Sequence, residues 1–264
     1  MAIRLEPSKR KIGKSKTSEI EKARKKIKSV DFAEPLSICV YGRNKTGKTV
    51  FACSSGLKTL VIDCNERGTA SVRKMKNVSV YRIQRWEDLD PIYWFLRNGD
   101  HEFEVIVIDT ITMLAMVCMR WVLKEEEDRD FNREPKTPDQ RSWGKMGEHI
   151  SEIITKFRNL PYHLIITAQE KVTTEEEEDG SSTSFSHPEL SPRPRSALMS
   201  AVGTIGRIYV KETTDKKGKK IFERRMLLGP HEKYLAGTRF PELKYIERNP
   251  TFGGFLEKIT GGEE

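Results

Sequence analysis

The sequence predicts an α/β protein with a mostly parallel central sheet flanked by helices, an antiparallel hairpin near the C-terminus and a basic N-terminal arm. Three observations support this class: a length of 264 residues, an alternation of apolar runs with amphipathic ones, and an uneven distribution of charge. The length allows a sizeable core. The longest apolar runs are far shorter than the ~20 residues of a membrane-spanning helix. The residues that follow Met1 become lysine-rich without an apolar run, so we do not expect them to act as a secretory signal. We therefore expect a cytoplasmic protein without a membrane partner.

The basic arm comprises residues 1–34. Residues 1–28 hold eleven of the 47 Lys and Arg but only three of the 39 Asp and Glu, so these 28 residues carry the whole net charge of +8. This charge favours a polyanion or an acidic neighbouring subunit as a partner, although a solubilising tail is the alternative. A cap at Ser18 followed by apolar residues at Ile20, Ala23, Ile27 and Val30 predicts a short amphipathic helix.

Residues 35–264 are expected to form one domain. Strands are predicted near residues 36–41, 59–64, 78–83, 103–108 and 163–168, with helices near 48–55, 87–98, 111–127 and 143–159. Strands that are apolar on both faces, such as Val-Ile-Val-Ile at 105–108, are typical of a parallel sheet covered by helices.

Two long loops are predicted to interrupt the alternation, at residues 128–141 and 172–195, and such loops are usually functional or mobile. Beyond them, apolar runs at 207–211 and 221–228 flank a turn at 215–218, which predicts an antiparallel hairpin. The four cysteines have no metal-binding spacing and are expected to be reduced and buried. They are Cys39, Cys53, Cys64 and Cys118.

A glycine-rich segment with the spacing G-x-x-x-x-G-K-T follows the first predicted strand. Its backbone amides would surround a β-phosphate, Lys48 would reach the β- and γ-oxygens, and Thr49 would ligate Mg²⁺. A chance match in a glycine-containing turn is the alternative. The residues predicted to bind ATP are Gly42, Arg43, Asn44, Lys45, Thr46, Gly47, Lys48, Thr49 and Val50.

Three further strand ends carry polar side chains suited to this chemistry. Asp109 is predicted to bind the metal, and capping of the next helix is its alternative role. Glu66, or else Asp63, could polarise the attacking water, although either could be an ordinary surface acid. Gln169 could sense the γ-phosphate or simply cap the following loop.

The order of these features resembles the RecA-like ATPase core, and most closely the compact phage nucleotide-binding proteins that act as single-strand annealing factors. The resemblance covers roughly residues 35–255. It implies that Mg-ATP is bound by the glycine-rich segment and Asp109, and that Glu66 activates water. The spacing in RecA would place this carboxylate nearer Asn65.

The same resemblance implies a DNA-contacting loop after Gln169. The first half of this loop, residues 175–179, is acidic, so we assign DNA contact to Arg193 and Arg195 at its far end. Phe185 is the exposed aromatic candidate, because Trp94, Trp121 and Trp143 follow helical core patterns. The resemblance also implies a segment at 233–240 that reaches a neighbour's ATP. Phage relatives often have a lysine where Gly237 stands, which leaves Arg239 as the finger in trans.

The function expected from these features is that of an oligomeric ATPase, slow and stimulated by single-stranded DNA, that anneals or pairs strands. Its catalytic residues would be Lys48, Glu66, Gln169 and Arg239. Its partners would be single-stranded DNA, further copies in a head-to-tail ring or filament, and a single-strand binding protein. The alternatives are an assembly module gated by ATP, a helicase or packaging motor on the same core, and a small-molecule kinase, for which the acidic loop is a poor lid.

Overall fold

A computed structural model gives the fold of the chain and describes residues 21–22, 24–25, 34–64, 66–176, 182–214 and 218–261, except for the side chains of residues 175 and 176. The chain divides into two units, Met1–Glu34 and Pro35–Glu264. The predicted arm helix lies largely outside the described residues; four residues within it, Glu21, Lys22, Arg24 and Lys25, are helical.

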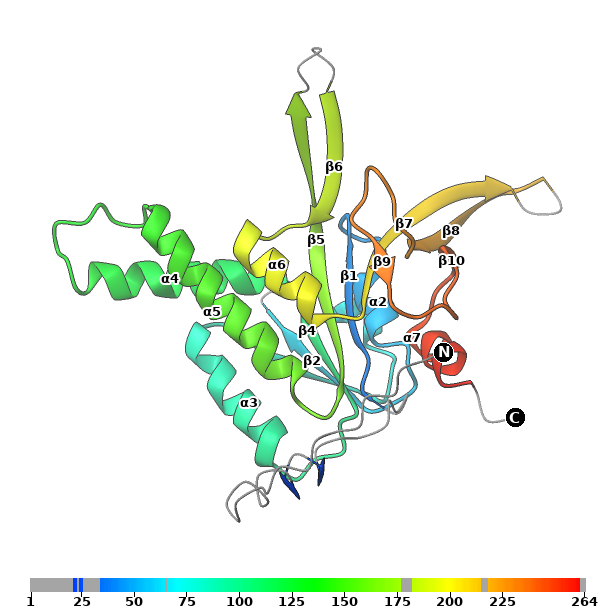
Figure 1. Cartoon of the computed structure of the whole chain (residues 1–264), viewed down its shortest axis with the longest axis horizontal. Coiled ribbons are helices and arrows are strands. Elements are labelled where there is room, and N and C mark those ends of the chain that lie inside the picture. Colours follow the sequence, from blue (N-terminus) through cyan, green and yellow to red (C-terminus); the bar gives the residue numbers. More distant parts are fainter. Residues whose placement is uncertain are drawn as a thin grey trace, which may run out of the picture. The chain divides into compact units, whose positions relative to one another are not determined.

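The second unit alternates strands and helices, and the elements up to residue 168 follow one another in the order that the sequence predicts (Figure 1). Beyond that residue, the hairpin of strands near 207–211 and 221–228 was predicted, whereas two helices and three short strands were not. Its helices are α2 (Lys48–Ala52), α3 (Leu89–Asn98), α4 (Ile111–Glu127), α5 (Gln140–Arg158), α6 (Pro192–Ala201) and α7 (Phe252–Thr260), with 3-10 turns η1 (Gly68–Val72) and η2 (Trp86–Asp88). Its strands are β1 (Ser37–Gly42), β2 (Thr59–Asp63), β3 (Val78–Arg82), β4 (Val105–Asp109), β5 (His163–Glu176), β6 (Ser182–Pro188), β7 (Thr204–Thr214), β8 (Lys220–Leu227), β9 (Gly237–Thr238) and β10 (Ile246–Arg248).

The strands form a mixed sheet in the order β10-β8-β7-β1-β5-β4-β2-β3. The pairs from β7 through β3 are parallel, whereas β8 and β10 extend the sheet with antiparallel pairs. The prediction of a largely parallel sheet with an antiparallel end is thus confirmed. All five residues of β4 are buried, because helices cover both faces of the sheet.

Two apolar clusters fill the space between the sheet and its helices. One cluster lies under α3, α4, α5 and α6, and the other lies under α2 and α7 on the opposite face (Figure 1). The four cysteines are buried and unpaired, as predicted. β1 lies between β5 and β7 and is parallel to both, so its carboxyl end lies at the same edge of the sheet as theirs. Parallel sheets usually bind a ligand at this edge.

The prediction of a structureless loop at 172–195 is wrong for the described part of that segment. β5 continues to Glu176 and pairs with β6 in an antiparallel hairpin, and α6 begins at Pro192. The β-branched and aromatic residues on both arms of the hairpin favour strands. Proline is favoured at the first position of a helix, because its fixed φ suits the helix and its missing N–H costs no hydrogen bond there. The loop between α4 and α5 is confirmed.

Candidate active site

The glycine-rich loop connects β1 to α2 and contains two residues with left-handed backbone conformations. Gly47 has φ 102° and Lys45 has φ 65°. At the start of the loop, a Cβ on Gly42 would lie 2.3 Å from the carbonyl oxygen of Ile208 in β7. Only glycine therefore allows the loop to leave the sheet at this point.

Lys48 is buried, with 7% of its surface exposed, and its Nζ donates to the carbonyl oxygens of Gly42 at 2.9 Å and Arg43 at 3.0 Å. Burial lowers the pKa of this ammonium, and three nearby carboxylates oppose that shift: Glu66, Asp109 and Glu170. The cation is therefore held inside the loop by groups that phosphate oxygens could replace or complement.

A hydroxyl and a carboxylate meet beside Lys48. Thr49 Oγ1 donates to Asp109 Oδ2 at 2.8 Å, and Thr167 Oγ1 donates to the other carboxylate oxygen. Burial raises the pKa of Asp109, while these two hydrogen bonds lower it. A Cβ on Gly68 would approach both the Thr49 hydroxyl and the Asp109 carboxylate at 3.4 Å, so glycine leaves space above the pair.

This oxygen pair fits Mg²⁺, which prefers hard oxygen ligands and often takes only one or two from the protein. In the described parts of the chain, no group of three or more His, Cys, Asp or Glu could hold a metal. Thr49 and Asp109 would thus hold the ion together with phosphate and water oxygens. The hydroxyl that caps α4 belongs to Thr110, which accepts from the Met113 N–H at 3.2 Å, so Asp109 does not cap this helix.

Glu66, which follows β2, and Gln169 of β5 are in direct contact through their side chains. Gln169 Nε2 donates to Glu66 Oε1, and Thr110 Oγ1 donates to the same oxygen at 3.3 Å. Asp63 is buried at the end of β2, and its Oδ1 accepts the N–H groups of Glu66 at 3.0 Å and Arg67 at 3.2 Å. Asp63 thus shapes the turn that presents Glu66.

Two charged residues near the site, Glu170 and Arg207, belong to no motif found in the sequence. Glu170, the neighbour of Gln169 on β5, is buried and accepts from Arg207 Nε of β7 at 2.6 Å. Its second oxygen has no hydrogen bond, and Arg43 of the loop lies 3.8 Å from it. A buried carboxylate therefore contacts both the loop and β7. In the sequence, Glu170 could have been identified as a site residue because it directly follows Gln169 at the end of an apolar strand.

The residues assigned to DNA lie in the first turn of α6, not at the end of a loop as predicted. Arg193 is exposed and lies 3.8 Å from Glu148 of α5. Arg195 is half-buried, and its Nη1 lies 2.8 Å from Nδ1 of His187. Arg239 follows β9 and is exposed, and its side chain makes no hydrogen bond or ion pair with the described residues.

The exposed aromatic residues differ from those expected. Phe185 is only half-buried, beside His187 on β6. Trp94 and Trp143 were interpreted as core residues but are 52% and 49% exposed, because each lies on the outward face of its helix. Phe131 is 94% exposed; it was not among the predicted stacking residues, although it is the aromatic residue of the loop between α4 and α5.

A loop of this spacing after a central strand, with a threonine bound to the carboxylate at the end of another parallel strand, defines a P-loop NTPase core. A family model described as an AAA domain matches residues 34–240, and the chain belongs to this family. Among solved structures, the chain is similar to the flagellar accessory protein FlaH from Methanocaldococcus jannaschii, with a TM-score of 0.41 and 12% identity over 83% of this chain and 88% of that one. No curated protein matches the chain.

Within the described residues, no helix has the length and apolar character that crossing a membrane requires.

Proposed function

We propose that this protein is an oligomeric ATPase that binds single-stranded DNA and promotes annealing or strand pairing. This is the activity of the phage RecA-like annealing factors that its sequence resembles. The hydrogen bond between Gln169 and Glu66 is the observation that carries the proposal, because it connects the reacting end of the nucleotide site to a projecting hairpin.

Gln169 lies where β5 changes partners. It pairs with Gly42 of the P-loop strand, and the next residue, Glu170, pairs with Pro188 of β6. The β5–β6 hairpin extends away from the sheet from this point (Figure 1). A change at Glu66 on loss of the γ-phosphate would therefore act directly on the base of the hairpin.

Each side chain of the site would have its own role in the binding and hydrolysis of Mg-ATP. Bound Mg-ATP would supply an electrophilic terminal phosphorus and a divalent charge on its oxygens. Lys48 would bind the β- and γ-oxygens, and Thr49 and Asp109 would hold the metal. Glu66 would orient the attacking water and accept its proton. Gln169 would keep Glu66 in position.

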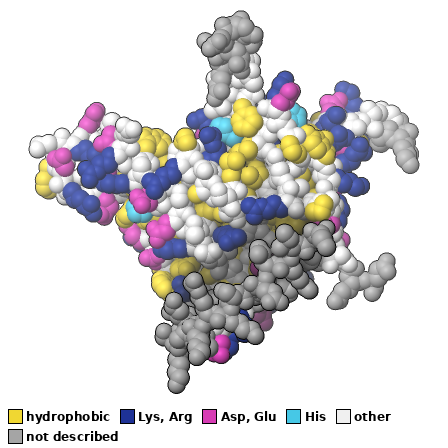
Figure 2. Space-filling model, in the orientation of Figure 1, with side chains coloured by type: hydrophobic (Ala, Val, Ile, Leu, Met, Phe, Trp, Pro, Cys, Tyr) yellow, Lys and Arg dark blue, Asp and Glu magenta, His cyan; other side chains and the backbone are white. Residues whose placement is uncertain are grey.

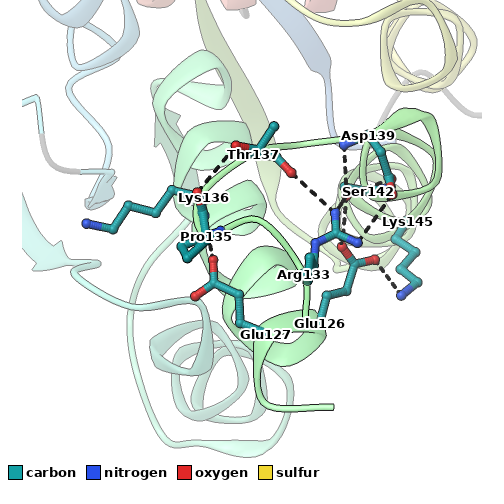
Figure 3. Close-up of polar contacts among 9 residues, drawn as sticks. All are labelled: Glu126, Glu127, Arg133, Pro135, Lys136, Thr137, Asp139, Ser142 and Lys145. Carbon is teal, nitrogen blue, oxygen red and sulfur yellow. Dashed lines mark hydrogen bonds and ion pairs between the residues drawn. The ribbon is translucent and has the colours of Figure 1, made fainter. Parts of the chain in front are cut away.

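The exposed α4–α5 loop supports a nucleic-acid surface. Phe131 offers an aromatic face on which a base could stack, and the Lys and Arg side chains at this end of the molecule lie among Asp and Glu side chains (Figure 2). Arg133 holds the base of the loop (Figure 3): its Nη2 donates to Ser142 Oγ at 2.7 Å and lies 2.9 Å from Glu126 Oε2. The loop thus presents Phe131 from a fixed base.

The exposed and unpaired state of Arg239 among the described residues supports a role in trans, in which a neighbouring copy places it on the γ-phosphate of ATP. A head-to-tail contact of this kind builds a ring or a filament.

The proposal is tested by phosphate release with and without single-stranded DNA at two salt concentrations. We expect DNA to stimulate turnover more strongly at low salt, because DNA binding releases counterions. Lys48→Ala should abolish turnover, whereas Lys74→Ala, which removes an exposed lysine, should not change it. A rate that no polynucleotide changes at low salt would contradict the coupling to DNA.

The same assay separates the alternatives. Assembly with ATP but without phosphate release would identify an assembly module. Displacement of a paired strand in one direction would identify a translocating motor.

A further inference from the structure

Arg224 of β8 places its guanidinium against the P-loop of its own chain. A Cβ on Gly47 would lie 2.6 Å from Arg224 Nε and 3.0 Å from its Cδ. Side chains alternate along a strand, so Arg224 shares its face of β8 with Met226, which is buried in the apolar cluster that includes Phe51 of α2. The side chain therefore leaves β8 on the face that carries the P-loop helix.

The backbone at Arg224 is held by the segment that leads into α7. Arg224 N donates to Asn249 Oδ1 at 3.2 Å, and Asn249 N donates to the Arg224 carbonyl oxygen at 2.7 Å. Shortly after Asn249, α7 packs on α2, where the Phe51 and Phe255 ring centroids are 5.2 Å apart. One segment thus contacts both β8 and the P-loop helix, and this fixes the position of Arg224 relative to the loop.

The guanidinium of Arg224 has no hydrogen bond or ion pair with any of the described residues, and the residue is exposed. Its neighbour Arg225 differs, because Arg225 Nε donates to Glu223 Oε2 at 2.6 Å. The Arg224 guanidinium is thus a second cation, besides Lys48, at the P-loop, and it adds to the positive potential next to Gly47. That arrangement favours an anion between the two cations.

We propose that Arg224 binds the α- and β-phosphates of the nucleotide in cis, from the side of the loop opposite the metal. In the sheet, β8 lies on one side of β1 and β4 lies on the other. Asp109 at the end of β4 and Glu66 thus mark the side of the metal and the γ-phosphate. Gly47, the residue that Arg224 contacts, belongs to the part of the loop that surrounds the β-phosphate. The inference rests on the proposed ATP-binding function and assigns a residue that this function did not use.

The test is equilibrium binding of ATP, ADP and AMP by calorimetry at one salt concentration. Arg224→Ala should weaken ATP and ADP binding by the same factor, roughly 10- to 100-fold, which is the range for charge-assisted hydrogen bonds. Arg224→Lys keeps the charge but loses the planar fork, so it should lie between the wild type and Arg224→Ala.

Arg248→Ala is the matched control. Arg248 pairs with Arg225 on the neighbouring strand, is exposed and has no ion pair with the described residues, so its removal should leave nucleotide affinity unchanged. Thermal unfolding without nucleotide should be the same for Arg224→Lys and the wild type, since the contacts with Asn249 use main-chain atoms of Arg224.

The possible outcomes separate this inference from the proposed function. Equal affinities of the wild type and Arg224→Ala for ATP would overturn the inference and leave the function intact. A loss restricted to ATP would also overturn it, because it would place Arg224 on the γ-phosphate. A wild-type protein that binds neither ATP nor ADP would overturn the function and the inference together.

Discussion

At the residue scale, Glu66 and Asp63 lie on one turn but have different surroundings. Glu66 contacts two side chains, Gln169 and Thr110, whereas the carboxylate of Asp63 accepts two main-chain N–H groups of its own turn. The two carboxylates, which the sequence left as alternatives, should therefore respond differently to substitution.

Glu66→Gln is expected to lower kcat about 100-fold or more, the usual contribution of a general base, while ATP affinity is retained. Asp63→Ala is expected to lower the free energy of unfolding by about 1–3 kcal/mol, because two N–H groups lose their acceptor. Single-turnover kinetics and urea denaturation of both variants provide the measurements. Full turnover by Glu66→Gln would exclude this residue as the base.

The imidazole of His163 predicts a pH dependence of stability. Its Nδ1 accepts the Leu36 N–H at 2.9 Å, which requires the neutral ring. Burial lowers the pKa of His163, and the charge of Glu104 only partly opposes this. The folded state therefore binds the proton less readily than the unfolded chain. The stabilisation is complete above the ordinary pKa of about 6.5 and is lost as the pH falls through the lowered pKa of the folded protein.

Urea denaturation at several pH values checks this expectation. The difference in free energy of unfolding between the wild type and His163→Asn should shrink between about pH 7.5 and about pH 5.5. The pKa of His187 is also lowered by burial, but His187 is present in both proteins, so its contribution cancels in the difference. A difference that stays constant across this range would contradict the assignment to His163.

At the scale of elements, the α4–α5 loop depends on one ion-pair cluster (Figure 3). Glu126 is 7% exposed, and both Arg133 and Lys145 contact its carboxylate, at 2.9 Å and 2.6 Å. Burial opposes ionisation of Glu126, but hydrogen bonds from Lys145 and Ser142 give a net lowering of its pKa. Removal of Arg133 would leave this buried charge with fewer partners.

Arg133→Met is expected to lower the free energy of unfolding by about 2 kcal/mol, because removal of one partner exposes the desolvation cost of the other. Arg129→Met is the control: Arg129 forms an exposed pair with Glu125 at 3.1 Å, and such pairs contribute less than about 1 kcal/mol. Urea denaturation measures both values. Equal effects of the two substitutions would show that the cluster does not hold the loop.

Most elements were predictable because their signals are local. The buried strands are short continuous apolar runs, and the long helices carry an amphipathic period in ten to twenty consecutive residues. The boundaries of β1, β4 and α4 differ from the prediction by no more than about two residues. The β5–β6 hairpin was missed because an acidic run that begins at Glu175 is typical of a solvated loop. In the described residues, pairing of β5 with β6 decides the conformation instead.

At the scale of the whole molecule, residues 1–28 of the basic arm carry a net charge of +8, equal to that of the entire chain. If the arm binds nucleic acid, deletion of residues 1–28 should reduce the slope of log affinity against log salt by about 0.7 for each phosphate of single-stranded DNA that the arm neutralises. ATP affinity should not change, because every residue assigned to the nucleotide lies in residues 35–264. Filter binding at several salt concentrations measures the slope. An unchanged slope together with loss of assembly would assign the arm to a neighbouring subunit instead.

The sequence by itself determined the P-loop, the strand that ends in Asp109, the order of strands and helices and the asymmetry of charge, since each is written in consecutive residues. Only the tertiary structure decided which distant side chains meet: Glu66 with Gln169, Glu170 with Arg207, and Arg224 with Gly47. The physical reason is that parallel strand register and helix packing bring residues far apart in the chain to one edge of the sheet. No local pattern encodes such a contact.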